Sequence, residues 1–163
     1  MTPADAARGD GGDAAVSGAE AHYRALESLY RAAPINRLFP SVLEIVEAGV
    51  ARIRFTVTSD VYHAAGAAHG TSYFKMLDDA AFYAANSLVS DRFLLTTAFN
   101  LLFTRPIVAG EVIAEGRWVS GRRRVMVADA RLIDAHGEEA ARGTGTFMRS
   151  RIPLAGLPGY SAS

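Results

Sequence analysis

Cysteine is absent from this chain of 163 residues, which excludes disulfides, thiolate metal sites and a cysteine nucleophile. No apolar run approaches the roughly 18 residues of a membrane span. The N-terminus lacks the basic and apolar segments of a secretory signal. Basic and acidic residues balance at 17 each, so the chain has no broad positive field for nucleic acid. These absences predict a cytoplasmic protein that binds neither membranes nor nucleic acid.

What is present is the composition of one ordinary globular domain, with 50% hydrophobic and 21% charged residues. Residues 1–17 are rich in Ala, Gly and Asp, which predicts a disordered N-terminal tail. Residues 151–163 are rich in Pro, Gly and Ser, which predicts a loose C-terminal tail. A single domain is therefore expected over residues 18–150, beginning with an amphipathic helix that ends at Pro34.

The hydrophobic pattern beyond Pro34 predicts six strands and one long helix. Two strand-like runs, at residues 41–48 and 50–58, predict two strands joined by a tight turn, and the second run nearly alternates between apolar and polar residues. Residues 72–88 predict the long helix, and its apolar stripe is small enough for a sheet to approach closely: Phe74, Leu77, Ala81, Ala84 and Leu88. Four further strand runs occupy residues 94–106, 111–121, 123–134 and 139–150. This order favours the α+β class, with an antiparallel sheet wrapped around one helix.

Residues suited to chemistry gather near the start of the long helix. His69 and Gly70 open it, and Asp78 follows nine positions after the histidine. Unpaired N–H groups at a helix N-terminus stabilise an oxygen that gains negative charge, and a carboxylate serves as a base or a nucleophile. Partial burial should raise the pKa of Asp78 above about 3.9 and still leave it ionised at neutral pH. His69 and Asp78 lie too far apart on one helix to contact the same carbonyl group, so two chains would have to supply them.

The segment GAAHGTSYFKMLDDAAFYAANSL resembles the central motif of the PaaI-type hotdog thioesterases, which is Gly-x-x-His-Gly-Gly with an acid nine positions after the histidine. Four positions match this motif: Gly66, His69, Gly70 and Asp78. The segment TTAFNLLFTRP resembles the next strand of the family, with Asn100 in its middle and Pro106 at its end. The resemblance extends over residues 42–148.

This resemblance implies an acyl-CoA thioesterase with the hotdog fold, in which a six-stranded antiparallel sheet wraps one helix, without a metal or other cofactor. It also implies a homodimer or homotetramer with active sites at the subunit interface. In each site the Gly70 N–H would donate to the oxyanion, and His69 would lie close to the thioester. Asp78 of the partner subunit would be the base or nucleophile, and Thr96 would help to hold the water.

Two positions depart from the family pattern. Thr71 replaces the second glycine, which narrows the approach to the carbonyl group. His63 stands where many members have asparagine, and its ring either hydrogen-bonds to the site or faces solvent. Gly66 and Asn100 complete the expected substrate-binding set. His22 and His136 are predicted to be surface residues.

Arginines could bind the phosphates of coenzyme A, because guanidinium groups form bidentate hydrogen bonds with phosphate oxygens. Arg105 is one candidate. The other candidates lie in a turn between two predicted strands, where the alternative is a solvated hairpin end: Arg122, Arg123 and Arg124.

Two other functions stay open from the sequence. One is a hydratase or dehydratase that acts on acyl thioesters with the same fold, and the spacing of the His-Gly pair and the acid favours hydrolysis over it. The other is a non-catalytic acyl-CoA-binding protein, and the presence of Asp78 favours an enzyme over it. The sequence does not decide the acyl group, the pathway, the choice between dimer and tetramer, or whether Asp78 is a nucleophile or a base.

Overall fold

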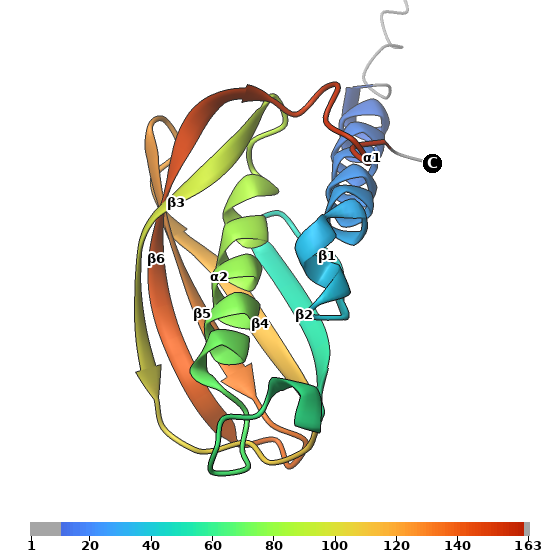
Figure 1. Cartoon of the computed structure of the whole chain (residues 1–163). Coiled ribbons are helices and arrows are strands. Elements are labelled where there is room, and N and C mark those ends of the chain that lie inside the picture. The colour runs from blue at the N-terminus through green and yellow to red at the C-terminus, as the bar shows by residue number, and fades with distance from the viewer. Residues whose placement is uncertain (1–10, 162–163) are drawn as a thin grey trace, which may run out of the picture.

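A computed structural model describes residues 11–161, in which one helix lies against a six-stranded antiparallel sheet and a second helix lies beside it (Figure 1). The strand order is β1-β2-β4-β5-β6-β3, so β1 and β3 are the two edges. The predicted α+β layout is confirmed. No helix within the described residues is long and apolar enough to cross a membrane. The elements are α1 (Gly11–Ala32), η1 (Pro34–Arg37), β1 (Ser41–Glu47), β2 (Val50–Val57), η2 (Ser59–Val61), α2 (Gly70–Asn86), β3 (Arg92–Phe103), β4 (Gly110–Ser120), β5 (Val125–Ile133) and β6 (Glu139–Pro153).

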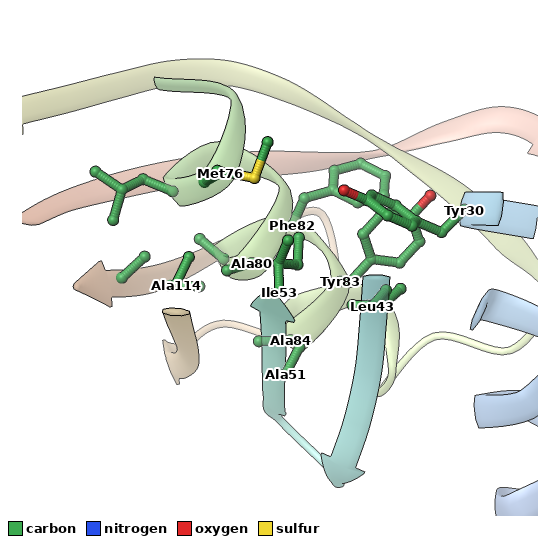
Figure 2. Packing of buried hydrophobic residues seen from close by; sticks show 14 of the residues in the cluster. Tyr30, Leu43, Ala51, Ile53, Met76, Ala80, Phe82, Tyr83, Ala84 and Ala114 are labelled. Carbon is green, nitrogen blue, oxygen red and sulfur yellow. The ribbon is translucent and has the colours of Figure 1, made fainter. Parts of the chain in front are cut away.

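Helix α2 lies in close contact with the middle of the sheet. Ala80 and Ala84 are fully buried, and Figure 2 shows them beside Ala51 of β2 and Ala114 of β4. A Cβ at Gly116 of β4 would lie 2.0 Å from the carbonyl oxygen of Ala80. Small residues on both elements therefore let the helix approach the strand backbone, as the alanine-rich stripe predicts.

One member of that predicted stripe was placed wrongly. Phe74 is exposed, and its ring contacts Phe99 of the edge strand β3 at a centroid distance of 5.8 Å. Tyr73 and Met76, which the stripe left out, are buried instead. The buried face of α2 is thus wider than the predicted stripe, because the sheet curves around more than one side of the helix.

Hydrogen bonds from the end of α2 fix the position of the start of β3. The buried Asn86 side chain donates hydrogen bonds to the carbonyl groups of Val89 and Arg92, at 3.0 and 3.1 Å. Its Oδ1 accepts a bond from the Leu94 N–H at 3.1 Å. These three bonds hold the loop between helix and strand, and so they determine where the side chains of early β3 lie against α2.

Both predicted tails need correction. Helix α1 begins at Gly11, within the segment predicted as a tail, and only residues 1–10 of that tail lie outside the described residues. At the other end, β6 continues to Pro153 and Leu154 is fully buried. The Tyr160 hydroxyl hydrogen-bonds to His22 Nδ1 at 2.7 Å. The C-terminal segment up to residue 161 therefore packs on α1.

This packing also corrects the prediction for His22. The ring is buried, and its Nε2 donates to the carbonyl oxygen of Asn86 at 3.0 Å. Burial lowers its pKa below the usual value, against the opposing effect of the Asn86 bond. His136, in the turn between β5 and β6, is exposed as predicted.

Candidate active site

Asp78 and Thr96 meet where α2 faces β3. The Thr96 hydroxyl donates a hydrogen bond to Asp78 Oδ1 at 3.0 Å. Both residues line a hollow of about 280 Å³ between α1, η1, α2 and β3. Burial raises the pKa of Asp78 to about 6, with a smaller rise from Asp79 and opposing effects from Thr96 and Lys75. The predicted rise is thus found, and the carboxyl group is still mostly ionised at pH 7.

A second acid, Asp79, lies beside Asp78 and is predicted from the sequence either to face solvent or to form a structural pair; it forms the pair. Asp79 accepts a hydrogen bond from Lys75, and Lys75 also donates to Asn36 Oδ1 at 2.8 Å. Burial raises the pKa of Asp79, and the Lys75 ammonium opposes that rise. The four-residue spacing of Lys75 and Asp79 was a usable sequence signal for this ion pair. No local pattern points to Asn36, which comes from a different part of the chain.

His69 and Gly70 form the N-terminus of α2. His69 is the N-cap, and its Nδ1 accepts a hydrogen bond from the Thr71 N–H at 3.2 Å. In the neutral ring the proton therefore sits on Nε2, which can donate to a ligand. Nothing among the described residues accepts a hydrogen bond from the Gly70 N–H. A Cβ at Gly70 would lie 3.2 Å from the Phe103 ring, so glycine lets the helix start close to the far end of β3.

Within one chain these two groups remain apart. The nine residues from His69 to Asp78 correspond to about 14 Å along a helix axis, at 1.5 Å per residue. The two groups cannot contact one carbonyl carbon together. These two places, one at the start of α2 and one at Asp78, are the two candidate half-sites of the chain.

The other predicted small and polar residues do not reach Asp78 in this chain. Gly66 has a positive φ of 83° in the loop before α2, a conformation that favours glycine. His63 is exposed, and its Nδ1 accepts a hydrogen bond from the Ala65 N–H at 3.1 Å. Asn100 points away from α2 into a different hollow, of about 440 Å³, lined by Arg117 and Asp129 among others. No three His, Asp or Glu side chains of the described part lie close enough together to hold a metal ion.

The candidate phosphate-binding arginines lie at opposite ends of the sheet. Arg105, near the start of α2, forms an exposed ion pair with Glu138 at 2.9 Å. Arg122 stacks over the Trp118 ring in the turn between β4 and β5. The carbonyl group of Arg124 accepts a hydrogen bond from the Arg149 N–H at 3.1 Å.

This turn belongs to a larger positive surface. Arg149 and Arg92 share a single acid, Asp91, at 2.5 and 3.8 Å. Arg92 also donates to the carbonyl group of Arg151 at 3.1 Å. Arginines from three segments therefore gather at this end of the sheet, and Asp91 is the counter-ion that two of them, Arg92 and Arg149, share. We call this surface the arginine end: Arg92, Arg122, Arg123, Arg124, Arg149 and Arg151.

Comparison with known proteins gives a family match for part of the chain and similar folds among solved structures. Residues 65–141, which include α2 and strands β3 to β5, match the model of the thioesterase superfamily. The structure is similar to that of the PaaI protein from the phenylacetic acid degradation operon of E. coli, with a TM-score of 0.73 and 20% identity, over 81% of this chain and 97% of that chain. No curated protein matches the chain in sequence.

Two further solved structures are similar. A thioesterase from Haemophilus influenzae has a TM-score of 0.70 at 14% identity, covering 80% of this chain and 90% of its own. A conserved protein from Pseudomonas aeruginosa has a TM-score of 0.68 at 24% identity, covering 72% of this chain and 94% of its own. The predicted hotdog fold is confirmed.

Proposed function

Since residues 65–141 match the model of the thioesterase superfamily, we propose that the protein is an acyl-CoA thioesterase, which hydrolyses its substrate to a free acid and coenzyme A. The observation that carries this proposal is the half-buried Asp78 carboxylate, which accepts a hydrogen bond from Thr96 and lines a hollow. A thioester offers such a carboxylate an electrophilic carbon and a good leaving group. The unpaired N–H of Gly70 supplies the donor that the developing oxyanion requires.

In the proposed reaction, each active site uses residues from two subunits. Thr96 occupies one oxygen of Asp78, so the other is available to accept a proton from water, which attacks the thioester carbonyl carbon. Direct attack by the carboxylate, through a mixed anhydride that water then hydrolyses, is the second route that this geometry allows. In both routes the oxyanion accepts a hydrogen bond from Gly70 of the partner subunit, and the coenzyme A thiolate leaves.

The edge strand β3 supports this arrangement of subunits. Leu102 and Phe103 are each 57% exposed on it, and long apolar edge strands are normally covered. We therefore propose a homodimer, alone or within a tetramer, that pairs two copies of β3 antiparallel. Antiparallel pairing would bring the Thr96 end of one strand towards the Phe103 end of the other. The Asp78 half-site would then lie near the partner subunit's Gly70 half-site.

Mixing two inactive variants tests whether the site is shared. One variant, Asp78→Asn, lacks the carboxylate but keeps the Gly70 donor. The other variant, Gly70→Pro, lacks the donor but keeps the Asp78 carboxylate. If each site takes one group from each subunit, a mixed dimer regains one intact site of two. Random reassociation of equal amounts should then restore about a quarter of wild-type turnover. No recovery, with subunit exchange verified by mass spectrometry of differently tagged chains, would contradict a shared site.

We propose that the arginine end binds the phosphates of coenzyme A through Arg122, Arg123 and Arg124. Arg105, which lies outside the arginine end, is a further candidate for the same role. The double variant Arg123→Glu/Arg124→Glu should raise KM for an acyl-CoA about tenfold at low salt, because charge-assisted bonds to phosphate are lost. Its kcat should change little. An acyl N-acetylcysteamine thioester has no phosphates, so its KM should stay the same. Arg54→Glu, on β2, is the matched charge control, and an equal KM rise there would refute a local clamp.

Release of free thiol from a panel of acyl-CoAs tests the proposed function itself. The panel runs from acetyl to long-chain and aryl thioesters, with an enoyl-CoA included to detect hydration. Turnover of saturated thioesters supports hydrolysis. Hydration of the enoyl-CoA without thiol release would indicate the hydratase alternative. Tight acyl-CoA binding without any turnover would indicate a binding protein.

A further inference from the structure

The hollow beside Asp78 has a wall that comes from outside the matched thioesterase region. We propose that the segment η1, fastened to α2 through Lys75, closes the acyl pocket, and that Ile35 sets the largest acyl group the enzyme accepts. This inference rests on the proposed thioesterase function. It adds a specificity-determining residue and an upper size for the substrate.

The walls of the hollow come from three parts of the chain. Phe82 of α2 lies on one side, and Phe93 and Leu95 of β3 lie on another. The remaining wall belongs to the α1–η1 segment, through Tyr30, Ala33, Ile35 and Asn36. Residues 30–36 precede the matched region, which starts at residue 65. The size of this hollow is thus a property of the N-terminal segment as well as of the thioesterase core.

The η1 wall is held in place by a buried ammonium group. Lys75 is only 12% exposed and donates to three acceptors, which are Asp79, Asn36 Oδ1 at 2.8 Å and the Tyr30 hydroxyl at 3.4 Å. The Asn36 amide in turn donates to the carbonyl group of Tyr30 at 2.6 Å. One of these bonds reaches Asn36 of η1, one reaches Tyr30 of α1 and one stays within α2 at Asp79, so the ammonium group links both α1 and η1 to α2. Beside this network, η1 contributes the apolar side chain of Ile35 to the surface of the hollow.

The hollow cannot easily extend at its inner end, because the side chains there are held in place. Figure 2 shows Tyr30, Phe82 and Tyr83 gathered together, and the rings of Tyr30 and Tyr83 meet edge to face at 5.3 Å. Tyr30 is also held by its hydroxyl, which bonds to Ser41 Oγ at 2.5 Å. Ile35, by contrast, is 45% exposed at the rim, so its size can change without disturbing the core. An acyl group that outgrows the pocket would meet Ile35.

The volume indicates which acyl groups fit. A cavity of about 150 Å³ holds a benzene molecule, and the hollow measures about 280 Å³. An acyl group of ring size with a few linking carbons fits that space, and so does a short or medium straight chain. A long-chain fatty acyl group does not. The aromatic and aliphatic walls formed by Phe82, Phe93 and Leu95 suit an apolar acyl group.

Changing Ile35 in both directions tests the inference. The readout is the ratio of kcat/KM for each longer straight-chain acyl-CoA to that for the shorter ones. Ile35→Ala should raise this ratio about tenfold for the first chain length that the wild type rejects, because each misfitting methylene costs tenfold or more in a tight apolar pocket. Ile35→Trp should lower the ratio for the longest chain that the wild type accepts. Leu38→Ala is the matched control, since Leu38 is 70% exposed in the same segment and lines no part of the hollow.

The outcomes separate this inference from the proposed function. Opposite shifts of the size limit in the two Ile35 variants, with Leu38→Ala unchanged, would support it. A size limit that stays in place in both variants, or a uniform loss at all chain lengths, would overturn it and leave the thioesterase proposal standing. A wild-type enzyme that releases no thiol from any acyl-CoA would overturn both.

Discussion

Replacing Asp78 by asparagine is expected to lower kcat for acyl-CoA hydrolysis by about 10²–10⁴, the usual contribution of a positioned base. Asparagine has the same shape, and its Oδ1 can still accept the hydrogen bond from Thr96. The variant therefore removes the negative charge and the proton acceptor while the packing stays the same. Thiol release under saturating substrate measures the loss. Asp60→Asn, at an exposed carboxyl in η2, is the control and should be fully active.

The same carboxyl group predicts the pH profile of the wild type. Burial raises the pKa of Asp78 to about 6, and only the ionised form can accept a proton or attack. The value of kcat/KM should therefore fall about tenfold per pH unit below pH 6 and level off above it. A profile that stays flat down to pH 5, or near-wild-type turnover by a folded Asp78→Asn, would contradict the role of Asp78.

Removing this charge should also stabilise the fold. The native state retains a proton on Asp78 between pH 3.8 and about 6, where the unfolded chain has released it. Native stability therefore falls as the pH rises through that window, and it stays lower above it. The pKa rise corresponds to at most about 3 kcal/mol. Urea unfolding at pH 8 should show Asp78→Asn to be more stable than wild type by up to that amount, with the difference vanishing near pH 4.

Replacing Gly70 by proline is expected to lower kcat by about 10²–10³, the usual effect of losing one oxyanion donor. Gly70 is the first helical residue of α2, a position where proline is common because no helical bond uses that N–H. His69 has a ψ of 145°, which suits a residue before proline. Helix α2 should therefore form normally without the donor. KM should change little, because the oxyanion exists only as the reaction proceeds.

Gly70→Ala separates the donor from the added bulk. Alanine places the same Cβ near Phe103 but keeps the N–H. It should retain most of the turnover that proline loses, with both variants compared by circular dichroism and thermal melting. Equal losses in the two variants would show that the close approach of Phe103, and not the hydrogen bond, limits the reaction.

Most of the fold could be predicted from local patterns. The near-alternation in residues 50–57 marks β2, and the alanines in α2 predict close contact with the sheet. The spacing of His69, Gly70 and Asp78 is equally local, since all three lie in or next to one helix. Such features depend on residues a few positions apart, whose relative placement follows from helix and strand geometry.

Contacts between distant segments could not be predicted in this way. Residues 151–163 look like a loose tail, yet Tyr160 meets His22 across 138 positions of sequence. Asn36 bears no local sign of its bond to Lys75. Phe74 fits the predicted stripe by its spacing, yet it is exposed beside the edge strand β3.

By itself the sequence determined the class of fold, the helix that carries Asp78 and the family resemblance. Each of these is encoded by residue type at short, regular spacing. Only the tertiary structure decided that Thr96 meets Asp78, that burial raises the pKa of Asp78 to about 6 and that α1 and η1 wall the hollow beside it. These properties depend on which surfaces exclude water from a group, and that follows from how the helices and strands pack together.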